Sequence, residues 1–190
     1  MNLLVFNYSM NSASQVFSHQ RKVVTKLSKY FAHIDVITAE TFQDSPIDGV
    51  NIYSTNWISG RKLKNIVNFY RISIPLLWKH RHGTIFSHMT EVQTFLSIPI
   101  SKLLFIRHFL WYAHKSPSKY LTLAYPHLDG VITSTPGSCP ISGNKVFPIG
   151  QAIEISLTSE VFEMPKTPPK SWYHIGRIAP SKNIDRIIEA

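Results

Sequence analysis

Short apolar runs alternate with segments of helical periodicity along the first 150 residues, and this alternation constrains the fold more than any other feature of the sequence. The runs are rich in β-branched and aromatic side chains, which favours strands. They lie at 3–6, 33–38, 50–53, 84–87, 109–112, 130–133 and 145–148, and the helical segments at 15–31, 61–78, 91–105 and 119–125. Strands that alternate with helices are joined by parallel crossovers. The sequence therefore predicts an α/β domain with a doubly wound parallel sheet.

The character of the chain changes after residue 150. The stretch 164–170 holds three prolines, which lack an amide hydrogen and fix φ, so 151–171 is interpreted as a Pro-rich linker. An apolar run at 172–175 then indicates a strand, and a helix begins at Ser181 and is cut off at Ala190. We therefore expect one domain at 1–150 and, at 172–190, the start of a second, truncated domain that is too short to bury a core of its own. The chain is expected to be a fragment.

The chain is strongly basic, with 20 Lys and Arg against 11 Asp and Glu and a formal net charge of +9. Such a charge is compatible with nucleic acid, an anionic membrane surface or phosphate-bearing small molecules. The basic residues are spread along the chain without a nucleic-acid-binding motif, so we expect no nucleic-acid partner. A single cysteine, Cys139, excludes a disulfide scaffold. With no predicted membrane span and no predicted signal peptide, a cytoplasmic location is expected.

The segment 61–82 combines six Lys and Arg residues with apolar and aromatic side chains. Such a basic helix can lie on an anionic membrane face, which would make the protein peripheral on the inner face of the membrane. The alternative is an ordinary amphipathic helix that packs on the sheet, and we weigh this alternative as about twice as favourable. Pro75 is expected to interrupt the helix.

Common signatures of phosphate loops and metal sites are missing. There is no G-x-G-x-x-G after the first strand, no G-x-x-x-x-G-K-[ST] and no H-E-x-x-H. His80 and His82 are two residues apart, so they do not share a helix face, and we expect a solvated basic helix end there. The sequence predicts no metal site.

The most informative segment for chemistry is 174–183. A predicted strand ends at Gly176, Arg177 follows it, and Lys182 lies in the first turn of the next predicted helix. Two cations then converge at a helix N-terminus, where free amide groups already favour an anion. Arg supplies a planar fork and Lys a point charge, which suits a diphosphate. The alternative is an ordinary pair of surface cations.

Several blocks in chain order make the sequence similar to a known family. They are 110–114 (Leu-Trp-Tyr-Ala-His), 129–134 (Asp-Gly-Val-Ile-Thr-Ser), 145–151 (Lys-Val-Phe-Pro-Ile-Gly-Gln) and the segment from Gly176 to Lys182, with 17–20 (Phe-Ser-His-Gln) fitting a subgroup that acts on bacterial surface polysaccharides. In these blocks the chain resembles the N-terminal part of the GT-B retaining glycosyltransferases of family 4 type, which include sucrose synthase and bacterial mannosyltransferases. The resemblance implies a Rossmann-like acceptor domain followed by the start of a nucleotide-sugar-binding domain.

The resemblance also implies roles for particular residues. Arg177 and Lys182, with Gly176, would bind the donor diphosphate and neutralise it as it leaves, so no metal or other cofactor is expected. His114 matches a histidine that lines the transfer cleft and is the candidate catalytic residue; the alternative is a structural, hydrogen-bonded histidine.

Three further residues are candidates for the acceptor side. His88 follows a predicted strand, at the edge where doubly wound sheets place ligands, although a structural use is more favourable there. Asn11 and Ser12 lie in the loop after the first strand.

The leading functional hypothesis is therefore a glycosyltransferase. It would move a sugar from a nucleotide sugar to a saccharide or lipid-linked acceptor in polysaccharide biosynthesis. The alternative is a non-catalytic α/β binding module that retains only an acceptor or membrane surface.

Overall fold

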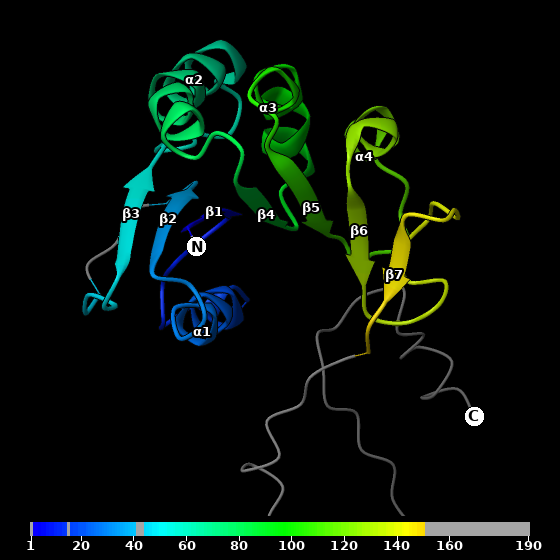
Figure 1. The fold of residues 1–190 in the computed structure, drawn as a ribbon, viewed down its shortest axis with the longest axis horizontal. Coiled ribbons are helices and arrows are strands. Elements are labelled where there is room, and N and C mark those ends of the chain that lie inside the picture. Colours follow the sequence, from blue (N-terminus) through cyan, green and yellow to red (C-terminus); the bar gives the residue numbers. More distant parts are fainter. Residues whose placement is uncertain (1, 15, 41–43, 151–190) are drawn as a thin grey trace, which may run out of the picture. The chain divides into compact units, whose positions relative to one another are not determined.

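A parallel sheet forms the framework of the protein. The computed structural model describes residues 2–14, 16–40 and 44–150, and in these residues seven strands pair in the order β3-β2-β1-β4-β5-β6-β7 (Figure 1). Every pairing is parallel. The strands are β1 (Asn2–Asn7), β2 (His33–Thr38), β3 (Val50–Ser54), β4 (Thr84–His88), β5 (Arg107–Trp111), β6 (Gly130–Thr133) and β7 (Val146–Pro148). The predicted α/β, Rossmann-like doubly wound sheet is confirmed.

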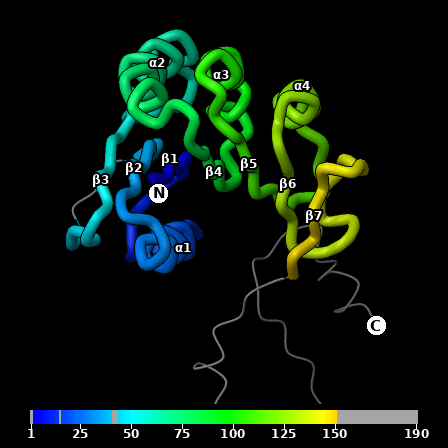
Figure 2. Tube along the Cα trace, viewed as in Figure 1, coloured from blue at the N-terminus to red at the C-terminus, as the bar shows by residue number. Residues whose placement is uncertain are grey.

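The helices lie on both faces of the sheet, as Figures 1 and 2 show. Helix α1 (Ser18–Leu27) covers one face, where its Val24 packs with Leu3 and Val5 of β1. The other face carries α2 (Lys62–Lys79), α3 (Glu91–Leu103) and α4 (Lys119–Ala124), which a 3-10 turn (Tyr125–His127) follows. Phe69 of α2 packs there on Leu4 and Phe6, the β1 residues that alternate with those under α1. Period-two alternation along β1 therefore supplies both layers of the core.

One predicted interruption is wrong. Helix α2 runs without a break from Lys62 to Lys79 through Pro75. Pro75 lies on the exposed side of the helix, where water can hydrogen bond the carbonyl that the proline leaves without a donor. The proposed linker at 151–171 and the second domain at 172–190 lie outside the described residues.

The amino edge of the sheet contains a buried carboxylate. Asp35 of β2 is fully buried and accepts hydrogen bonds from Lys79 Nζ at 2.6 Å and from His80 Nε2 at 2.7 Å. His33 Nε2 lies 3.0 Å and Asn51 Nδ2 3.2 Å from the same carboxylate. Burial alone would raise the pKa of Asp35, but these hydrogen bonds hold the pKa well below its usual range.

The expectation of a solvated basic helix end at His80 is therefore wrong. The side chain of His80 is buried because the end of α2 packs over β2 and turns this histidine inward to Asp35. His82, two residues later, is exposed. Helix α2 ends at Lys79 with His80 as its C-cap, whereas His82 lies in the turn beyond the helix, where its φ of 61° breaks the helical path.

A second buried histidine belongs to the core. His108 of β5 is completely buried, and its Nε2 lies 2.7 Å from the hydroxyl of Ser87 on β4. Burial lowers the pKa of His108 to about 3. The charge of Asp129 opposes this shift and the charge of Lys102 adds to it, both to a smaller extent. His108 is therefore a neutral structural residue at pH 7 and has no access to a substrate.

Candidate functional site

The candidate site lies where the two central strands end. β1 and β4 are neighbours, but the chain leaves β1 toward α1 on one face and leaves β4 toward α3 on the other. Such a switch point opens a crevice at the carboxyl edge of a doubly wound sheet, the usual place for a ligand. The loops at this edge are 8–17 after β1, 89–90 after β4 and 112–118 after β5.

Gln20 of α1 fastens two of these loops together. Its buried Oε1 accepts hydrogen bonds from the backbone amides of Tyr8 and Ser9, both at 3.0 Å. Its Nε2 donates to the carbonyl oxygen of His88 at 3.2 Å. One side chain therefore uses both ends of its amide to fix the exit of β1 against the exit of β4.

His88, an acceptor-side candidate from the sequence, is the buried titratable group of the site. Its ring lies 5.2 Å from the ring of His19 and 6.1 Å from that of Trp111, measured between centroids. Burial, with a smaller contribution from His19, lowers the pKa of His88 to about 4, so the ring is neutral at pH 7. Its buried Nδ1 has no hydrogen-bond partner in the described part of the chain. Eight other buried side-chain atoms of the described residues also lack a partner, including Nδ1 of His80 and of His108. The place of His88 at the switch point, together with its unpaired nitrogen, therefore makes it a candidate for ligand contact.

His19 is exposed beside His88, and its tautomer follows from its hydrogen bond to the backbone. Nδ1 lies 3.0 Å from the carbonyl oxygen of Val16, which can only accept, so Nδ1 carries the proton. In the neutral ring Nε2 is then a hydrogen-bond acceptor. The site can therefore accept a proton or hydrogen bond from a hydroxyl group at this position.

His114, the catalytic candidate, is exposed in the loop after β5. Its Nδ1 is an acceptor, whereas the Nδ1 of His19 is a donor. Its Nδ1 accepts a hydrogen bond from the backbone amide of Ser116 at 3.1 Å. When neutral, the ring presents Nε2–H as a donor. The amide of Ala113, 3.3 Å from Met89 Sδ, ties this loop to the loop after β4. Within the loop, the Tyr112 hydroxyl donates to the Ser116 carbonyl.

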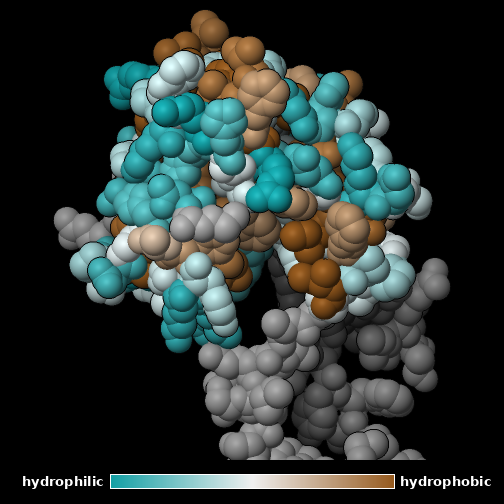
Figure 3. Space-filling view, viewed as in Figure 1, coloured by the Kyte–Doolittle hydropathy of each residue, from teal (hydrophilic) through white to brown (hydrophobic). Residues whose placement is uncertain are grey.

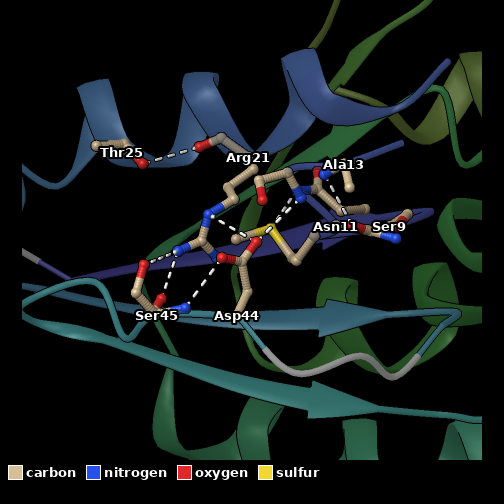
Figure 4. A network of polar contacts seen from close by, with 10 residues as sticks. Ser9, Asn11, Ala13, Arg21, Thr25, Asp44 and Ser45 are labelled. Atoms are coloured by element: carbon tan, nitrogen blue, oxygen red, sulfur yellow. Dashed lines mark hydrogen bonds and ion pairs between the residues drawn. The ribbon is translucent and has the colours of Figure 1, made fainter. Parts of the chain in front are cut away.

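The loop after β1, which contains Asn11 and Ser12, is attached to the chain beyond β2 (Figure 4). The amide of Ser12 donates to Asp44 Oδ2 at 3.0 Å, and Arg21 Nε lies 3.4 Å from the same oxygen. Arg21 also donates to the carbonyl of Ser45. The Ser12 hydrogen bonds lower the pKa of Asp44, and the Ser45 amide and then the charge of Arg21 add smaller contributions in the same direction.

Asn11 stabilises its own loop. Its Oδ1 accepts from the Ala13 amide at 2.9 Å, and its backbone amide donates to Ser9 Oγ at 3.2 Å. The structure therefore places Asn11 and Ser12 in a loop with a defined shape at the carboxyl edge.

Three contributors to this site were not singled out as site residues from the sequence: His19, Gln20 and Arg21. All belong to the first turn of α1, where polar residues are ordinary, and nothing in the sequence distinguishes a buried Gln or Arg from an exposed one. The inward rotation of α1 buries Gln20 and Arg21. Gly176, Arg177 and Lys182 lie outside the described residues.

Among the described residues, no group of three or more His, Cys, Asp or Glu side chains converges as a metal site requires. None of the helices in that part of the chain has the length and hydropathy needed to cross a bilayer. A pocket of about 480 Å³, lined by His33 and residues 46–51, lies at the amino edge, away from the strand ends where doubly wound sheets bind ligands.

The comparisons with known proteins agree with the fold. No model of a known protein family matches the sequence, and no curated protein matches it. Among solved structures, the chain is similar to Alr3699/HepE from Anabaena in complex with UDP, with a TM-score of 0.52 and 12% identity. The likeness covers 83% of this chain and 46% of that one, so this chain spans about half the length of the solved protein.

Proposed function

We propose that the protein is the acceptor-side part of a GT-B-type glycosyltransferase that uses a nucleotide sugar. The observation that carries this proposal is the β1–β4 switch point, at whose carboxyl edge neutral His88 lies beside His19 and Gln20 fixes the surrounding loops. A doubly wound sheet binds its ligand at this point. The fold likeness to HepE, which was solved with UDP, supports a nucleotide-sugar donor.

The reaction would join an acceptor hydroxyl to the anomeric carbon of the donor sugar. The new bond forms between the hydroxyl oxygen and this carbon, and the bond from the carbon to the diphosphate oxygen breaks. The nucleoside diphosphate leaves with the electron pair of that bond, and the hydroxyl proton is lost to a base. In this proposal Arg177 and Lys182 bind the diphosphate and balance its charge without a metal or other cofactor.

The described histidines divide the remaining tasks. His19 Nε2 accepts a hydrogen bond from the acceptor hydroxyl, and His114 Nε2–H donates one to a sugar oxygen or to the leaving phosphate. His88 lies beneath the exposed His19 as an uncharged, buried group. We propose a saccharide or lipid-linked acceptor in polysaccharide biosynthesis. We place the reaction in the cytoplasm, and the unpaired Cys139 supports a reducing compartment.

The test is an assay of the protein expressed from its complete reading frame. Release of nucleoside diphosphate is measured with UDP-, GDP- and ADP-hexoses, with a mixture of saccharide and lipid-linked saccharide acceptors. Turnover is expected with one donor class, and Arg177→Ala and Lys182→Ala should each reduce it at least about 100-fold, while Lys26→Ala, an exposed cation of α1, should not.

Unchanged turnover in both variants would contradict the diphosphate role. Acceptor binding without turnover for any donor would favour the alternative, a non-catalytic binding module.

A further inference from the structure

Helix α2 has two apolar faces, and the sheet covers only one of them. Its buried face contains Phe69, Leu76 and Leu77. Four large apolar side chains remain on the outside: Leu63 (77% exposed), Val67 (56%), Ile74 (48%) and Trp78 (62%). At 3.6 residues per turn these four lie within an arc of about 60° along about 22 Å of helix. We call them the outer stripe. A helix that only packed on the sheet would carry polar residues there.

The end of α3 extends this apolar surface. Leu103 and Phe105 are each 75% exposed, and the Phe105 ring stacks on His82 just beyond α2 with centroids 5.9 Å apart. The guanidinium of Arg81 lies 6.0 Å from the centre of the Trp78 ring. Figure 3 shows the brown, hydrophobic residues that gather over α2 and α3 on this side of the molecule, with teal residues beside them.

The charges around the outer stripe have one sign. Between Asp48 and Asp129 the chain has ten Lys or Arg residues and one acidic residue, Glu91. On and next to α2 the exposed cations are Arg61, Lys62, Lys64, Arg71, Lys79 and Arg81, and the end of α3 adds Lys102 and Arg107. Of these, Lys79 pairs with Asp35 and Lys102 lies 3.6 Å from Asp129. The remaining cations have no carboxylate partner within the described residues.

We propose that this surface, the outer stripe with Leu103 and Phe105, docks on an anionic lipid bilayer. A narrow apolar stripe with an aromatic residue and flanking Lys and Arg matches a helix that lies in the plane of a membrane interface. Long basic side chains reach the headgroups while their stems cover apolar surface. Trp78 suits the boundary between hydrocarbon and water. Anionic headgroups complement the excess positive charge, whereas a second copy of this chain would bring the same charge into contact with itself.

Docking along α2 also has a geometric consequence. The helix begins after β3, at the carboxyl edge of the sheet, so Leu63 lies at the end of the outer stripe closest to the candidate site. A bilayer beneath α2 would hold lipid-linked substrates near the crevice. The docking itself does not depend on the proposed transferase activity, because vesicle binding is measured without any sugar.

The experiment is co-sedimentation of the 190-residue chain with vesicles. Vesicles of equal parts phosphatidylglycerol and phosphatidylcholine are compared with pure phosphatidylcholine at 50 and 300 mM salt. The chain should bind the anionic vesicles at low salt, with at least tenfold weaker binding to the neutral ones. A basic protein binds any anionic surface weakly, so binding of the wild type alone does not identify the surface that docks. The comparison of the variants below identifies it.

Arg71→Glu with Arg81→Glu should weaken binding to anionic vesicles by at least about 25-fold, since each cation at a membrane surface contributes about fivefold. Lys26→Glu with Lys29→Glu on the α1 side changes the net charge equally and should change binding less than about threefold. Trp78→Ser with Phe105→Ser should weaken binding at least tenfold, whereas Tyr30→Ser with Leu123→Ser, which are exposed elsewhere, should not.

Circular dichroism confirms that each variant is folded. Equal losses for the two charge pairs, or unchanged binding in Trp78→Ser with Phe105→Ser, would overturn the proposal. So would a concentration-dependent dimer that the same apolar substitutions abolish, because the surface would then belong to a second copy.

Discussion

The two edges of the sheet both contain buried histidine, but they use it differently. At the amino edge, His80 is paired through Nε2 with the buried Asp35, which also binds Lys79, Asn51 and His33. At the carboxyl edge, His88 has no carboxylate partner among the described residues; it lies among the rings of His19, Phe86 and Trp111, and its Nδ1 is unpaired. The Nδ1 of His80 is unpaired as well. The two histidines therefore differ in that His80 binds a buried carboxylate through Nε2, whereas His88 packs among aromatic rings.

This difference separates a structural cluster from a candidate site. A buried carboxylate with four partners is stable as it stands, and a ligand would have to displace bonds that already exist. An uncharged ring with an unpaired nitrogen, at the switch point of the sheet, can gain a bond when a ligand binds. The hydrogen-bond partners of a buried polar residue are therefore more informative about function than its residue type alone.

Removal of Asp35 should have the largest effect on stability. Asp35→Ala leaves His80 and Lys79 without their anion, and breaking a buried pair costs about 3 kcal/mol or more in the free energy of unfolding. Urea denaturation measures the loss, with Asp48→Ala, an exposed carboxylate, as a control that should change stability by less than about 0.5 kcal/mol. Equal stability of the two variants would show that the amino-edge cluster is not structural.

The buried His88 at the carboxyl edge should make the stability of the protein depend on pH. A histidine in the unfolded chain binds its proton near pH 6.5, whereas His88 in the folded chain binds it near pH 4. Between these values the unfolded state holds more protons, so His88 lowers stability as pH falls from about 6.5 to 4, by about 2–3 kcal/mol in total. Above pH 6.5 it has no such effect.

The measurement is the free energy of unfolding of the wild type and of His88→Gln at pH 7, 5.5 and 4. His108 titrates in the same direction in both proteins, so the difference between the two curves isolates His88. The stability advantage of the wild type over His88→Gln should shrink or reverse toward pH 4. The unfolded wild type gains a proton at residue 88 as the pH falls, and the variant has no titratable group there. Parallel curves would mean that His88 is solvated and its ring is not buried as described.

Gln20→Leu should weaken the carboxyl edge without disturbing the amino edge. The substitution leaves the buried amide of Ser9 without an acceptor and removes the donor to His88, which costs about 1–3 kcal/mol. Gln20→Glu keeps the acceptor and should lose less. Hydrogen exchange should accelerate at Tyr8 and Ser9 while the protection of β2 amides near Asp35 is kept. Uniform acceleration across the sheet would show that the two edges are not independent.

The strands could be predicted from the sequence because their pattern is local. Four of the six residues in the run 33–38 are β-branched, and the structure has β2 at the same six residues. Pro75 was misread because the effect of a proline on a helix depends on which side faces water, and no local pattern gives this. The order of the strands follows from crossovers between distant segments.

The site was only partly predictable for the same reason. His88 and His114 could be placed at the carboxyl edge, because each follows a predicted strand of a parallel sheet. The inward rotation of Gln20 and His80 depends on how α1 and α2 dock, so an exposed and a buried side chain look alike in the sequence. Whether a histidine binds a carboxylate, as His80 does, or packs beside another histidine, as His88 does, depends on residues far away in the chain.

His114 should have the smallest effect on stability and a clear effect on turnover, which makes it the sharpest test of the contrast. The side chain is exposed and its one bond is to the adjacent Ser116 amide, so His114→Ala should change the free energy of unfolding by less than about 0.5 kcal/mol. Transfer by the complete protein should fall about 10- to 100-fold if Nε2–H donates to the substrate. His114→Gln keeps an N–H donor near that position and should recover part of the loss. If Ala and Gln variants lose turnover equally, the donor role is wrong and the residue only shapes its loop. If neither loses turnover, the loop after β5 is not part of the site, and the carboxyl-edge chemistry is confined to the residues that Gln20 holds around His88.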